Sequence, residues 1–243
     1  MSLLDWIYPP KCMACQTILM PVHNSFEKYL CANCKSLFVP IADPFCLRCG
    51  HPKKNSSVST QSSCISCRGK EFYFENHRAA FAYEEVVREM VLNIKFRSKR
   101  QVAQGLGWLF ADVCKNWNIK GDYIVPIPLH PSKKRMRGFN QATLLAQPIG
   151  SVCGIPVANN MMLRIKKTPP QSGLSALARE QNLSNAFRCN NKKYNVAGKT
   201  IILIDDIFTS GATINACAKC LLESNAAKIY AVSLCITLKG DTD

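Results

Sequence analysis

The sequence predicts an α/β protein, a parallel sheet flanked by helices, with a small metal-binding unit ahead of it. In the C-terminal part, short apolar runs alternate with stretches of helical spacing, which is the pattern of sheets built from strand–helix units. In the first 67 residues, eight of the 14 cysteines form four Cys-x-x-Cys pairs, a spacing typical of zinc-binding turns. We therefore expect two domains, residues 1–70 and 71–243.

The four cysteine pairs predict two closed, structural zinc sites. Each Cys-x-x-Cys turn directs two thiolates at one point, and two turns complete a tetrahedral site with no position left for chemistry. We prefer pairing along the sequence, first with second and third with fourth, and an interleaved arrangement is also open. A redox role is the alternative, less favoured because redox pairs seldom occur four at a time. The expected ligands are Cys12, Cys15, Cys31, Cys34, Cys46, Cys49, Cys64 and Cys67.

The overall composition indicates polyanionic partners and a reducing compartment. The chain has 31 lysines and arginines against 16 acids, a net charge of +15, which favours nucleic acid or phosphorylated substrates. No run of 18 apolar residues exists, so no membrane span is expected. Residues 1–10 contain Asp5 and lack the basic and apolar regions of a signal peptide. Because many cysteines occur without an export signal, we expect a cytoplasmic protein.

The second domain is expected to alternate strands and helices. Apolar runs of four residues predict buried strands, and spacings of three and four predict helices. Pro148 is expected to shorten or kink the helix that follows Asn140. In order, the expected elements are a strand within Glu71–Tyr83, helices Glu84–Lys95 and Gln101–Asn116, strands Asp122–Leu129, Met161–Arg164 and Ile201–Ile204, a helix Ile214–Glu223 and a strand Ala227–Thr237.

Two further pairs of side chains have structural interpretations. With eight thiols available, His23 and His51 are interpreted as surface residues rather than zinc ligands. Cys217 and Cys220 lie three apart on the last expected helix. We interpret them as helix packing rather than as a third metal site.

A cluster of cations at the end of the first expected helix is a candidate nucleic-acid contact. It surrounds one aromatic residue, Phe96, and cations with an aromatic ring suit the backbone and bases of a single strand. A helix end whose charge complements the helix dipole is an equally good interpretation. The candidate DNA-binding residues are Lys95, Arg97, Lys99 and Arg100.

A second basic segment follows the strand that ends at Leu129. In an α/β sheet this position is the carboxyl edge, where ligands bind. Its cations suit a pyrophosphate group, and a basic surface loop is the alternative. The candidate residues are Lys133, Lys134, Arg135 and Arg137.

The segment from Lys199 to Asn215 predicts a phosphate site with a sugar clamp. Two carboxylates, Asp205 and Asp206, follow the buried strand directly, and adjacent carboxylates can accept hydrogen bonds from the neighbouring hydroxyls of a ribose. A turn of small residues and a helix N-terminus come next, where backbone N–H groups and the helix dipole favour phosphate. The turn consists of Thr209, Ser210, Gly211, Ala212 and Thr213.

This segment resembles the phosphoribosyl-pyrophosphate (PRPP) motif of type I phosphoribosyltransferases. Further resemblance is carried by Val125–His130 with Arg135-x-Arg137-Gly-Phe-Asn-Gln-Ala142, and by the run from Thr168 through Gln171 and Arg179 to Phe187. With the cysteine tandem, these motifs are similar to the ComF family, which is linked to natural transformation. The resemblance implies a type I phosphoribosyltransferase fold behind a double zinc ribbon, with Gln171 and Arg179 in a hood over the second substrate.

Two functions follow from the resemblance. In the first, the protein is needed for DNA uptake in natural transformation, with a PRPP site, single-stranded DNA as a partner, and a competence helicase or recombination-loading protein as a further partner. In the alternative, it is an active phosphoribosyltransferase of nucleotide salvage, which moves ribose 5-phosphate from PRPP to a nitrogenous base. Asp205 and Asp206 then act as the catalytic pair, and Mg²⁺ arrives with PRPP.

Overall fold

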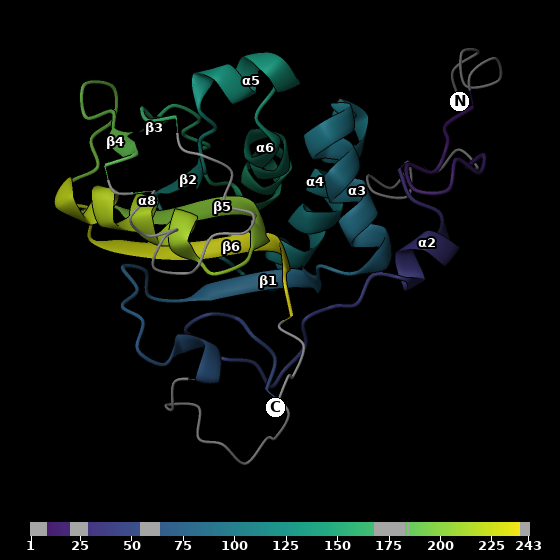
Figure 1. Cartoon of the computed structure of the whole chain (residues 1–243), viewed down its shortest axis with the longest axis horizontal. Coiled ribbons are helices and arrows are strands. Elements are labelled where there is room, and N and C mark those ends of the chain that lie inside the picture. Colours follow the sequence, from purple (N-terminus) through teal and green to yellow (C-terminus); the bar gives the residue numbers. More distant parts are fainter. Residues whose placement is uncertain (1–8, 20–28, 54–63, 168–182, 184, 239–243) are drawn as a thin grey trace.

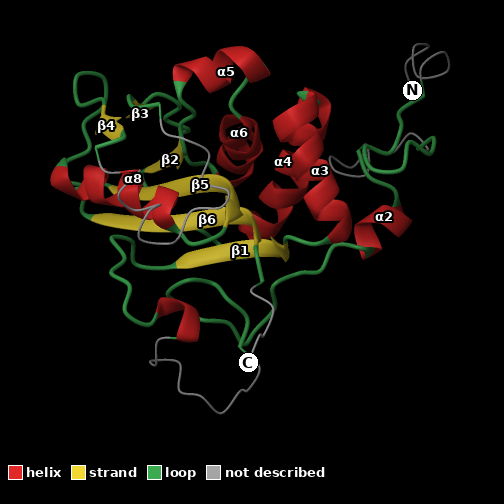
Figure 2. Ribbon diagram, viewed as in Figure 1, coloured by secondary structure: helices red, strands yellow, loops and turns green. Residues whose placement is uncertain are grey.

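A parallel four-stranded sheet forms the centre of the protein. The computed structural model describes residues 9–19, 29–53, 64–167, 183 and 185–238. The strand order is β1-β6-β5-β2, and every neighbouring pair is parallel (Figures 1 and 2). The strands span His77–Ala82 (β1), Tyr123–Pro126 (β2), Thr200–Phe208 (β5) and Lys228–Ile236 (β6). The expected parallel α/β sheet is therefore confirmed.

Helices cover both faces of this sheet. They are α3 (Glu85–Arg97), α4 (Arg100–Asn116), α5 (Pro131–Arg137), α6 (Gln141–Cys153) and α8 (Ala212–Glu223), with two short pieces, α2 (Ala32–Ser36) and a 3₁₀ turn (Ile65–Cys67), in the cysteine-rich part. Within β5, Ile202 and Ile204 pack with α3, α4 and α6, whereas Ile201 and Leu203 pack with α8. Successive residues of a strand point to opposite faces, so this one apolar run serves two cores.

The helix that follows Asn140 is not shortened by proline, so the first of the two expected effects is wrong, and the expected kink stays a prediction. α6 runs for 13 residues with Pro148 inside it. A proline removes the hydrogen bond to the carbonyl four residues earlier, here that of Leu144. Gly107 of α4 packs so closely there that an added Cβ would lie 2.6 Å from the Leu144 oxygen. The tight packing of α4 on α6 therefore stabilises the helix across the proline.

The basic segment after β2 forms a helix rather than an irregular loop. Pro131 occupies the first helical turn of α5, and the Ser132 N–H donates to His130 Nδ1 as an N-cap. Gly138 ends the helix in a left-handed conformation, with φ +82°. Proline at the start and glycine just past the end are the usual helix boundaries. Because the segment is helical, its four cations point in different directions around the helix axis.

A two-stranded antiparallel sheet lies beside α8. It consists of β3 (Met162–Arg164) and β4 (Phe187–Cys189). The short strand expected at Met161–Arg164 is thus confirmed to within one residue. The hood residues Gln171 and Arg179 lie outside the described residues, so their predicted role stays a prediction.

The two cysteine-rich units pack against different parts of the α/β domain. The first contributes Cys12, Met13 and Cys34 to the core shared with α3 and α4. The second contributes Cys46, Cys49 and Cys67 to the core on the other face of the sheet. In Figure 1 the first unit, with α2, lies beside α3, and the second lies beyond β1. Among the described residues, no helix has both the length and the apolar character needed to cross a bilayer.

Candidate functional site

Two buried carboxylates mark the carboxyl end of β5. Asp205 and Asp206 are 8% and 4% exposed, and both lie inside the strand, which continues to Phe208. Asp205 Oδ1 accepts a hydrogen bond from the Asp206 N–H at 2.9 Å, and Asp206 Oδ1 accepts one from the Ile207 N–H at 3.1 Å. Because strand side chains alternate, the two adjacent acids meet different surroundings.

The Asp206 side of the strand carries a cation from α3. Lys95 Nζ lies 2.9 Å from Asp206 Oδ2 in an ion pair whose side chains are 24% and 6% exposed. Burial by itself would raise the pKa of Asp206, but the charge and hydrogen bond of Lys95 outweigh it and lower this pKa below its ordinary value. The reverse holds for Lys95: burial opposes its charge, and Asp206 raises its pKa. Asp206 is therefore ionised at neutral pH.

The Asp205 side is poorer in compensating charge. Burial raises the pKa of Asp205 well above its usual range, and the charge of Asp206 raises it further. Its electrostatic neighbours include Arg164 of β3 and the buried Cys217 thiol of α8. Two adjacent acids with pKa values shifted in opposite directions are typical of a functional site, because a purely structural pair has no need of a buried second carboxylate.

The cations of α5 divide into two that are partly buried and two that are exposed. Lys133 and Arg137 lie one helical turn apart and are partly buried, and burial lowers the pKa of both. Arg137 donates from Nη1 to the Gln141 side chain, while its buried Nε has no hydrogen-bond partner. Lys134 and Arg135 are exposed. The cations predicted to bind pyrophosphate therefore form an inner pair, Lys133 and Arg137, and an outer pair, Lys134 and Arg135.

Lys133 also belongs to a wider group of cations. Burial is the main cause of the lowered pKa of Lys133, and the positive charges of Arg164, Arg137 and Lys95 lower this pKa further. Four cations held close together repel one another, and an anionic ligand would relieve that repulsion. The arrangement can thus accept a ligand with several negative charges beside the two acids.

The predicted phosphate loop joins β5 to α8. Gly211 is the N-cap residue of α8 with φ +80°, and Ser210 Oγ accepts a hydrogen bond from the Ala212 N–H at 3.4 Å. α8 begins at Ala212, two residues earlier than the helix expected at Ile214. Thr209 and Thr213 flank the turn, and all five predicted loop residues therefore lie at a helix N-terminus beside the acids. Such an end favours an anion.

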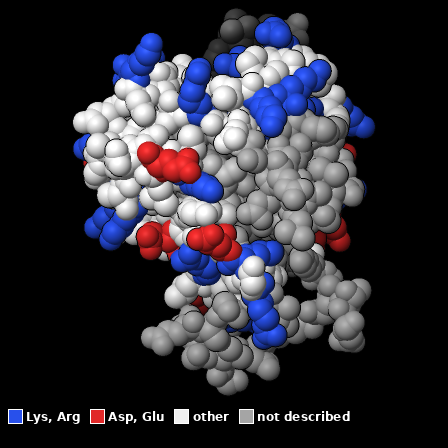
Figure 3. Space-filling view, turned by 60° about the vertical axis from the view of Figure 1, so that its left-hand side comes forward, with Lys and Arg blue, Asp and Glu red and all other residues white. Residues whose placement is uncertain are grey.

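The structure splits the predicted nucleic-acid cluster at the end of α3. Lys95 belongs to the acid site, as described above. The other three cations, Arg97, Lys99 and Arg100, are exposed, and Phe96 is 78% exposed. The face in Figure 3 carries several separate groups of lysine and arginine and fewer acids, in keeping with the overall positive charge.

Sequence reasoning missed two members of the acid site, Lys95 in its actual role and Arg164. Lys95 was predicted to contact DNA because its neighbours in sequence are cations around one aromatic ring, whereas its partner in the structure, Asp206, is distant in the chain. Arg164 ends a strand of only three residues. β3 pairs antiparallel with β4, so the rule that ligands bind at the carboxyl ends of parallel strands does not extend to Arg164.

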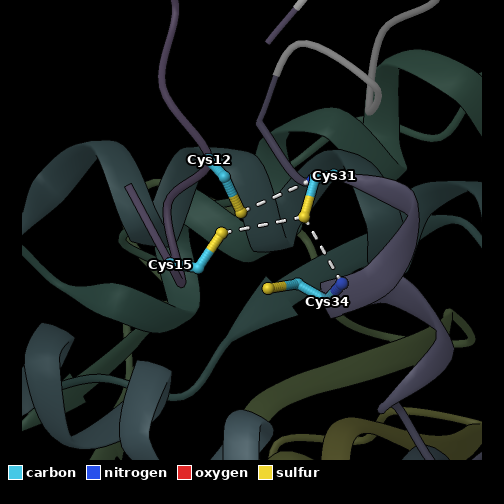
Figure 4. Close-up of side chains that lie close together, drawn as sticks. All are labelled: Cys12, Cys15, Cys31 and Cys34. Carbon is cyan, nitrogen blue, oxygen red and sulfur yellow. Dashed lines mark hydrogen bonds between the residues drawn. The ribbon is translucent and has the colours of Figure 1, made fainter. Parts of the chain in front are cut away.

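The four cysteines of each unit converge on one point, so pairing along the sequence is confirmed. The ligand atoms of Cys12, Cys15, Cys31 and Cys34 all lie within 4.8 Å of one another, as do those of Cys46, Cys49, Cys64 and Cys67. Figure 4 shows the first cluster, in which the Cys15 and Cys31 sulfurs are 3.7 Å apart and the Cys34 N–H donates to Cys31 Sγ.

These distances fit tetrahedral zinc. Four sulfurs at about 2.3 Å from a zinc ion are separated by about 3.8 Å, and the Cys46–Cys67 pair is 3.8 Å apart. All eight cysteines are free thiols. Burial raises the pKa of Cys49 and Cys67, so that thiolates at these positions need a bound cation. Both clusters therefore fit structural zinc ions.

One expectation about the histidines near the clusters is wrong. His51 is 8% exposed rather than on the surface, and its Nδ1 lies 3.4 Å from Cys49 Sγ. This nitrogen can donate to the thiolate and orient a zinc ligand. His23 lies outside the described residues. Cys217 and Cys220 lie on α8 and form no metal-binding group with other described residues.

Comparison with known proteins identifies both parts of the chain. The sequence matches the double zinc ribbon domain family over residues 3–69 and the phosphoribosyl transferase domain family over residues 98–242. Among solved structures, glutamine phosphoribosylpyrophosphate amidotransferase from B. subtilis, complexed with ADP and GMP, aligns with a TM-score of 0.40 at 16% identity, over 55% of this chain and 26% of that chain.

Three curated relatives resemble most of the chain. Competence protein F of Haemophilus influenzae is 29% identical over 90% of this chain and 93% of its own length. The DNA utilization protein YhgH of Salmonella typhimurium is 31% identical over 79% of this chain and 84% of its own. Competence protein ComFC of Bacillus subtilis is 29% identical over 83% and 81%. With a double zinc ribbon followed by a phosphoribosyltransferase domain, the chain belongs to the ComF family of competence proteins.

Proposed function

We propose that this protein acts in the handling of DNA during natural transformation and binds PRPP at the end of β5. The observation that carries the proposal is the buried acid pair, Asp205 and Asp206, next to the phosphate loop and the inner cations. The relatives named competence proteins support the biological setting. The phosphoribosyltransferase family supports the class of ligand.

Each part of PRPP has a group of complementary residues. The acid pair accepts hydrogen bonds from the ribose hydroxyls. The loop of residues 209–213 and the N-terminus of α8 take the 5-phosphate. Lys133 and Arg137 take the pyrophosphate from inside, with Lys134 and Arg135 at the rim. Magnesium prefers oxygen ligands and is held mainly by the substrate's own oxygens, with the two carboxylates beside it.

A transfer reaction is the second candidate, and the ionised state of Asp206 favours it. When a nitrogen nucleophile displaces pyrophosphate, the C1–N bond forms as the C1–O bond breaks, and the ribose gains positive character at C1. A carboxylate kept ionised by Lys95 can stabilise that charge. The protein then orients the reactants and supplies electrostatics rather than a covalent nucleophile.

Calorimetric titration with PRPP and Mg²⁺ tests the binding proposal. We expect saturable binding by the wild-type protein and by Asp112→Asn, a control for an exposed acid on α4, and none by the double variant Asp205→Asn, Asp206→Asn. Equal affinity in all three proteins would remove the site. Release of pyrophosphate, followed with PRPP alone and with a panel of nitrogenous bases, separates the two candidates: turnover assigns an enzyme, and binding without release assigns a binding protein.

Contact with single-stranded DNA is proposed for the exposed residues from the end of α3 to the start of α4, together with those of α5. Phe96 and Met136 are 78% and 79% exposed, and each is the sequence neighbour of an inward-facing cation, Lys95 or Arg137. An exposed aromatic ring beside Arg97, Lys99 and Arg100 offers stacking together with phosphate contacts. The outer pair of α5, Lys134 and Arg135, extends the same charge.

Salt dependence of affinity for a labelled single-stranded oligonucleotide tests this contact. Reversing the charge of Arg97, Lys99 and Arg100 together should flatten the slope of log affinity against log salt by about 0.7 per lost phosphate contact. Lys192→Glu, at another exposed lysine, is the matched control and should change the slope by at most one such contact. An unchanged slope in the triple variant would exclude these residues.

A further inference from the structure

We propose that Phe208 and His77 are positioning residues, which hold the phosphate loop against the second cysteine cluster, so that affinity for a 5-phosphate depends on that cluster and not on the first. The inference rests on the proposed function, because it concerns the same loop. It is carried by a continuous series of contacts from the cluster to the loop, none of which involves the acid pair.

The first contact joins Phe208 to the loop. Phe208 is the last residue of β5, is 2% exposed and directly precedes Thr209. An added Cβ on Gly211 would lie 2.7 Å from Phe208 Cζ and 3.4 Å from Phe72 Cε1. The left-handed turn at Gly211 therefore rests on the edge of the Phe208 ring. If the ring moved, the N-cap of α8 would lose its support.

The second contact joins Phe208 to His77 of β1. The two rings are stacked, with centroids 3.9 Å apart and planes 19° from parallel. Phe74 and His51 approach the same phenylalanine edge-on, each with its ring centroid 6.4 Å away. Close packing of aromatic rings from several segments leaves little freedom for any one of them.

The third contact joins His77 to the backbone of a cluster ligand. His77 Nδ1 lies 2.8 Å from the Cys49 carbonyl oxygen, and Nε2 lies 2.8 Å from Ser233 Oγ. A carbonyl can only accept, so Nδ1 carries the proton that it donates to Cys49. The one proton of the Ser233 hydroxyl is shared between His77 Nε2 and the Cys235 carbonyl, which lies 3.0 Å from Ser233 Oγ. The His77 N–H also donates to the Arg48 carbonyl at 3.1 Å. Both bonds fix His77 relative to the turn that carries Cys46 and Cys49.

That turn has little freedom of its own when its cysteines are held. The Gly50 N–H donates to the Cys46 carbonyl at 2.7 Å, and the Cys46 N–H donates to the His51 carbonyl at 2.8 Å. Gly50 has φ +76°, and an added Cβ would lie 2.8 Å from His77 Nδ1. If the four thiols separate, this backbone loses the anchor that sets the position of His77.

The first cluster makes a different set of contacts and serves as an internal control. Its unit packs on α4, where an added Cβ on Gly105 would lie 2.6 Å from the Met13 sulfur and 2.8 Å from Tyr29 Cβ. Its cysteines join the core of α3 and α4 rather than the core that contains Phe208. Loss of this cluster should thus leave the phosphate loop in position.

The experiment compares two ligands that use different parts of the site. Ribose 5-phosphate requires the phosphate loop, whereas pyrophosphate requires Lys133 and Arg137. We would titrate each ligand, with Mg²⁺, into the full-length wild type, Phe208→Leu, Cys64→Ser for the second cluster and Cys15→Ser for the first. Cys64 and Cys15 are the more exposed members of their clusters, half-buried and exposed respectively, which makes them a matched pair.

We expect affinity for ribose 5-phosphate to fall at least about tenfold in Phe208→Leu and in Cys64→Ser, because small displacements of a binding group are costly. Affinity for pyrophosphate should stay within about twofold in every variant, and Cys15→Ser should resemble the wild type with both ligands. Phe208→Leu keeps an apolar side chain in the core, so it provides a result even if Cys64→Ser fails to fold.

Three results would overturn the inference. The first is unchanged affinity for ribose 5-phosphate in Phe208→Leu. The second is an equal loss of both ligands, since that would reflect general loosening of the fold. The third is an equal effect of the two cysteine variants on ribose 5-phosphate. If the wild type bound pyrophosphate but not ribose 5-phosphate or PRPP, the proposed function itself would fail, and the two failures are therefore distinguishable.

Discussion

The two sides of β5 hold identical carboxylates in opposite electrostatic surroundings. On the side of α3 and α5, Asp206 is paired with Lys95 at 2.9 Å, and its pKa is lowered. On the side of α8 and β3, burial raises the pKa of Asp205 well above its usual range. The alternation of a strand separates neighbours in sequence into separate environments. Two identical residues can therefore supply one fixed charge and one titratable group to the same ligand.

The largest expected effect is the loss of PRPP affinity when both carboxylates are removed. Asp205→Asn with Asp206→Asn preserves side-chain size and the oxygens that accept the two backbone N–H groups, so the fold should persist. Affinity for PRPP with Mg²⁺ should fall at least about a hundredfold, because hydrogen bonds to charged groups are the strong ones. Calorimetry measures the affinity, and circular dichroism checks the fold. A folded variant with wild-type affinity would contradict the assignment.

The next largest effect concerns stability on the Asp206 side. Lys95→Met leaves a buried carboxylate without its cation. We expect the free energy of unfolding at neutral pH to fall by about 2–3 kcal/mol. This loss is at the low end of what breaking a buried ion pair costs, because the Lys95 side chain is partly exposed. Adding Asp206→Asn to Lys95→Met should restore most of this loss. Urea unfolding of the single and double variants measures it. No recovery in the double variant would mean that Lys95 acts through packing alone.

A third prediction compares one cation from each side of the strand. Arg137→Gln on the Asp206 side and Arg164→Gln on the Asp205 side should each lower PRPP affinity by about tenfold, since both are partly buried cations near the acids. Arg135→Gln removes an exposed cation from the same helix as Arg137 and should change affinity by less than about twofold. Equal effects of the Arg135 and Arg137 substitutions would show that the inner and outer halves of α5 are not distinct.

The smallest expected effect is on the pH dependence of stability, because the contributions of Asp205 and Asp206 to the free energy of unfolding change with pH in opposite directions. The pKa of Asp205 is raised on folding, so this group favours the folded state only at low pH, and its contribution is lost as pH rises from about 4 toward its folded pKa. Asp206 has a lowered pKa, and its contribution is present at neutral pH and lost in acid.

The sign of each substitution follows from that difference. Asp205→Asn should stabilise the fold at neutral pH by about 0.5–2 kcal/mol, as removal of a strained functional group often does, whereas Asp206→Asn should destabilise it by leaving Lys95 unpaired. Urea unfolding from pH 2 to 8 measures both slopes, because the Asp206 contribution changes only below the ordinary carboxyl pKa of about 4 and the Asp205 contribution only above it. Shifts of the same sign in the two variants would mean that the two carboxylates share one environment.

Much of the site could be predicted from sequence because its signals are local. The apolar run before Asp205, the small residues up to Thr213 and the spacing of the cysteines each depend on neighbours in the chain. The pairing of Lys95 with Asp206 does not depend on neighbours in the chain, because the packing of α3 against the end of β5 brings the two residues together. The expected shortening at Pro148 was wrong for a related reason. The local rule that proline ends a helix was overridden by the close contact of α6 with Gly107 of α4.

The boundaries of α5, which were not among the expected elements, could also have been predicted from the sequence. Proline at the start of a helix and glycine just past its end are signals in the sequence itself, and Pro131 and Gly138 mark α5 in this way. With the helix predicted, the spacing of four residues would have placed Lys133 and Arg137 on one face. It would thereby have separated them from Lys134 and Arg135. By contrast, the β3 strand that carries Arg164 is three residues long. A segment of that length has too little periodicity to predict which side chain reaches a site in another part of the fold.

The most direct test of the PRPP site is a crystal structure of the protein soaked with PRPP and Mg²⁺. We predict electron density for the ribose hydroxyls at Asp205 and Asp206, for the 5-phosphate at the turn around Gly211, and for the pyrophosphate over Lys133 and Arg137. Density for PRPP elsewhere, or an intact Lys95–Asp206 pair beneath an empty site at saturating ligand, would contradict it.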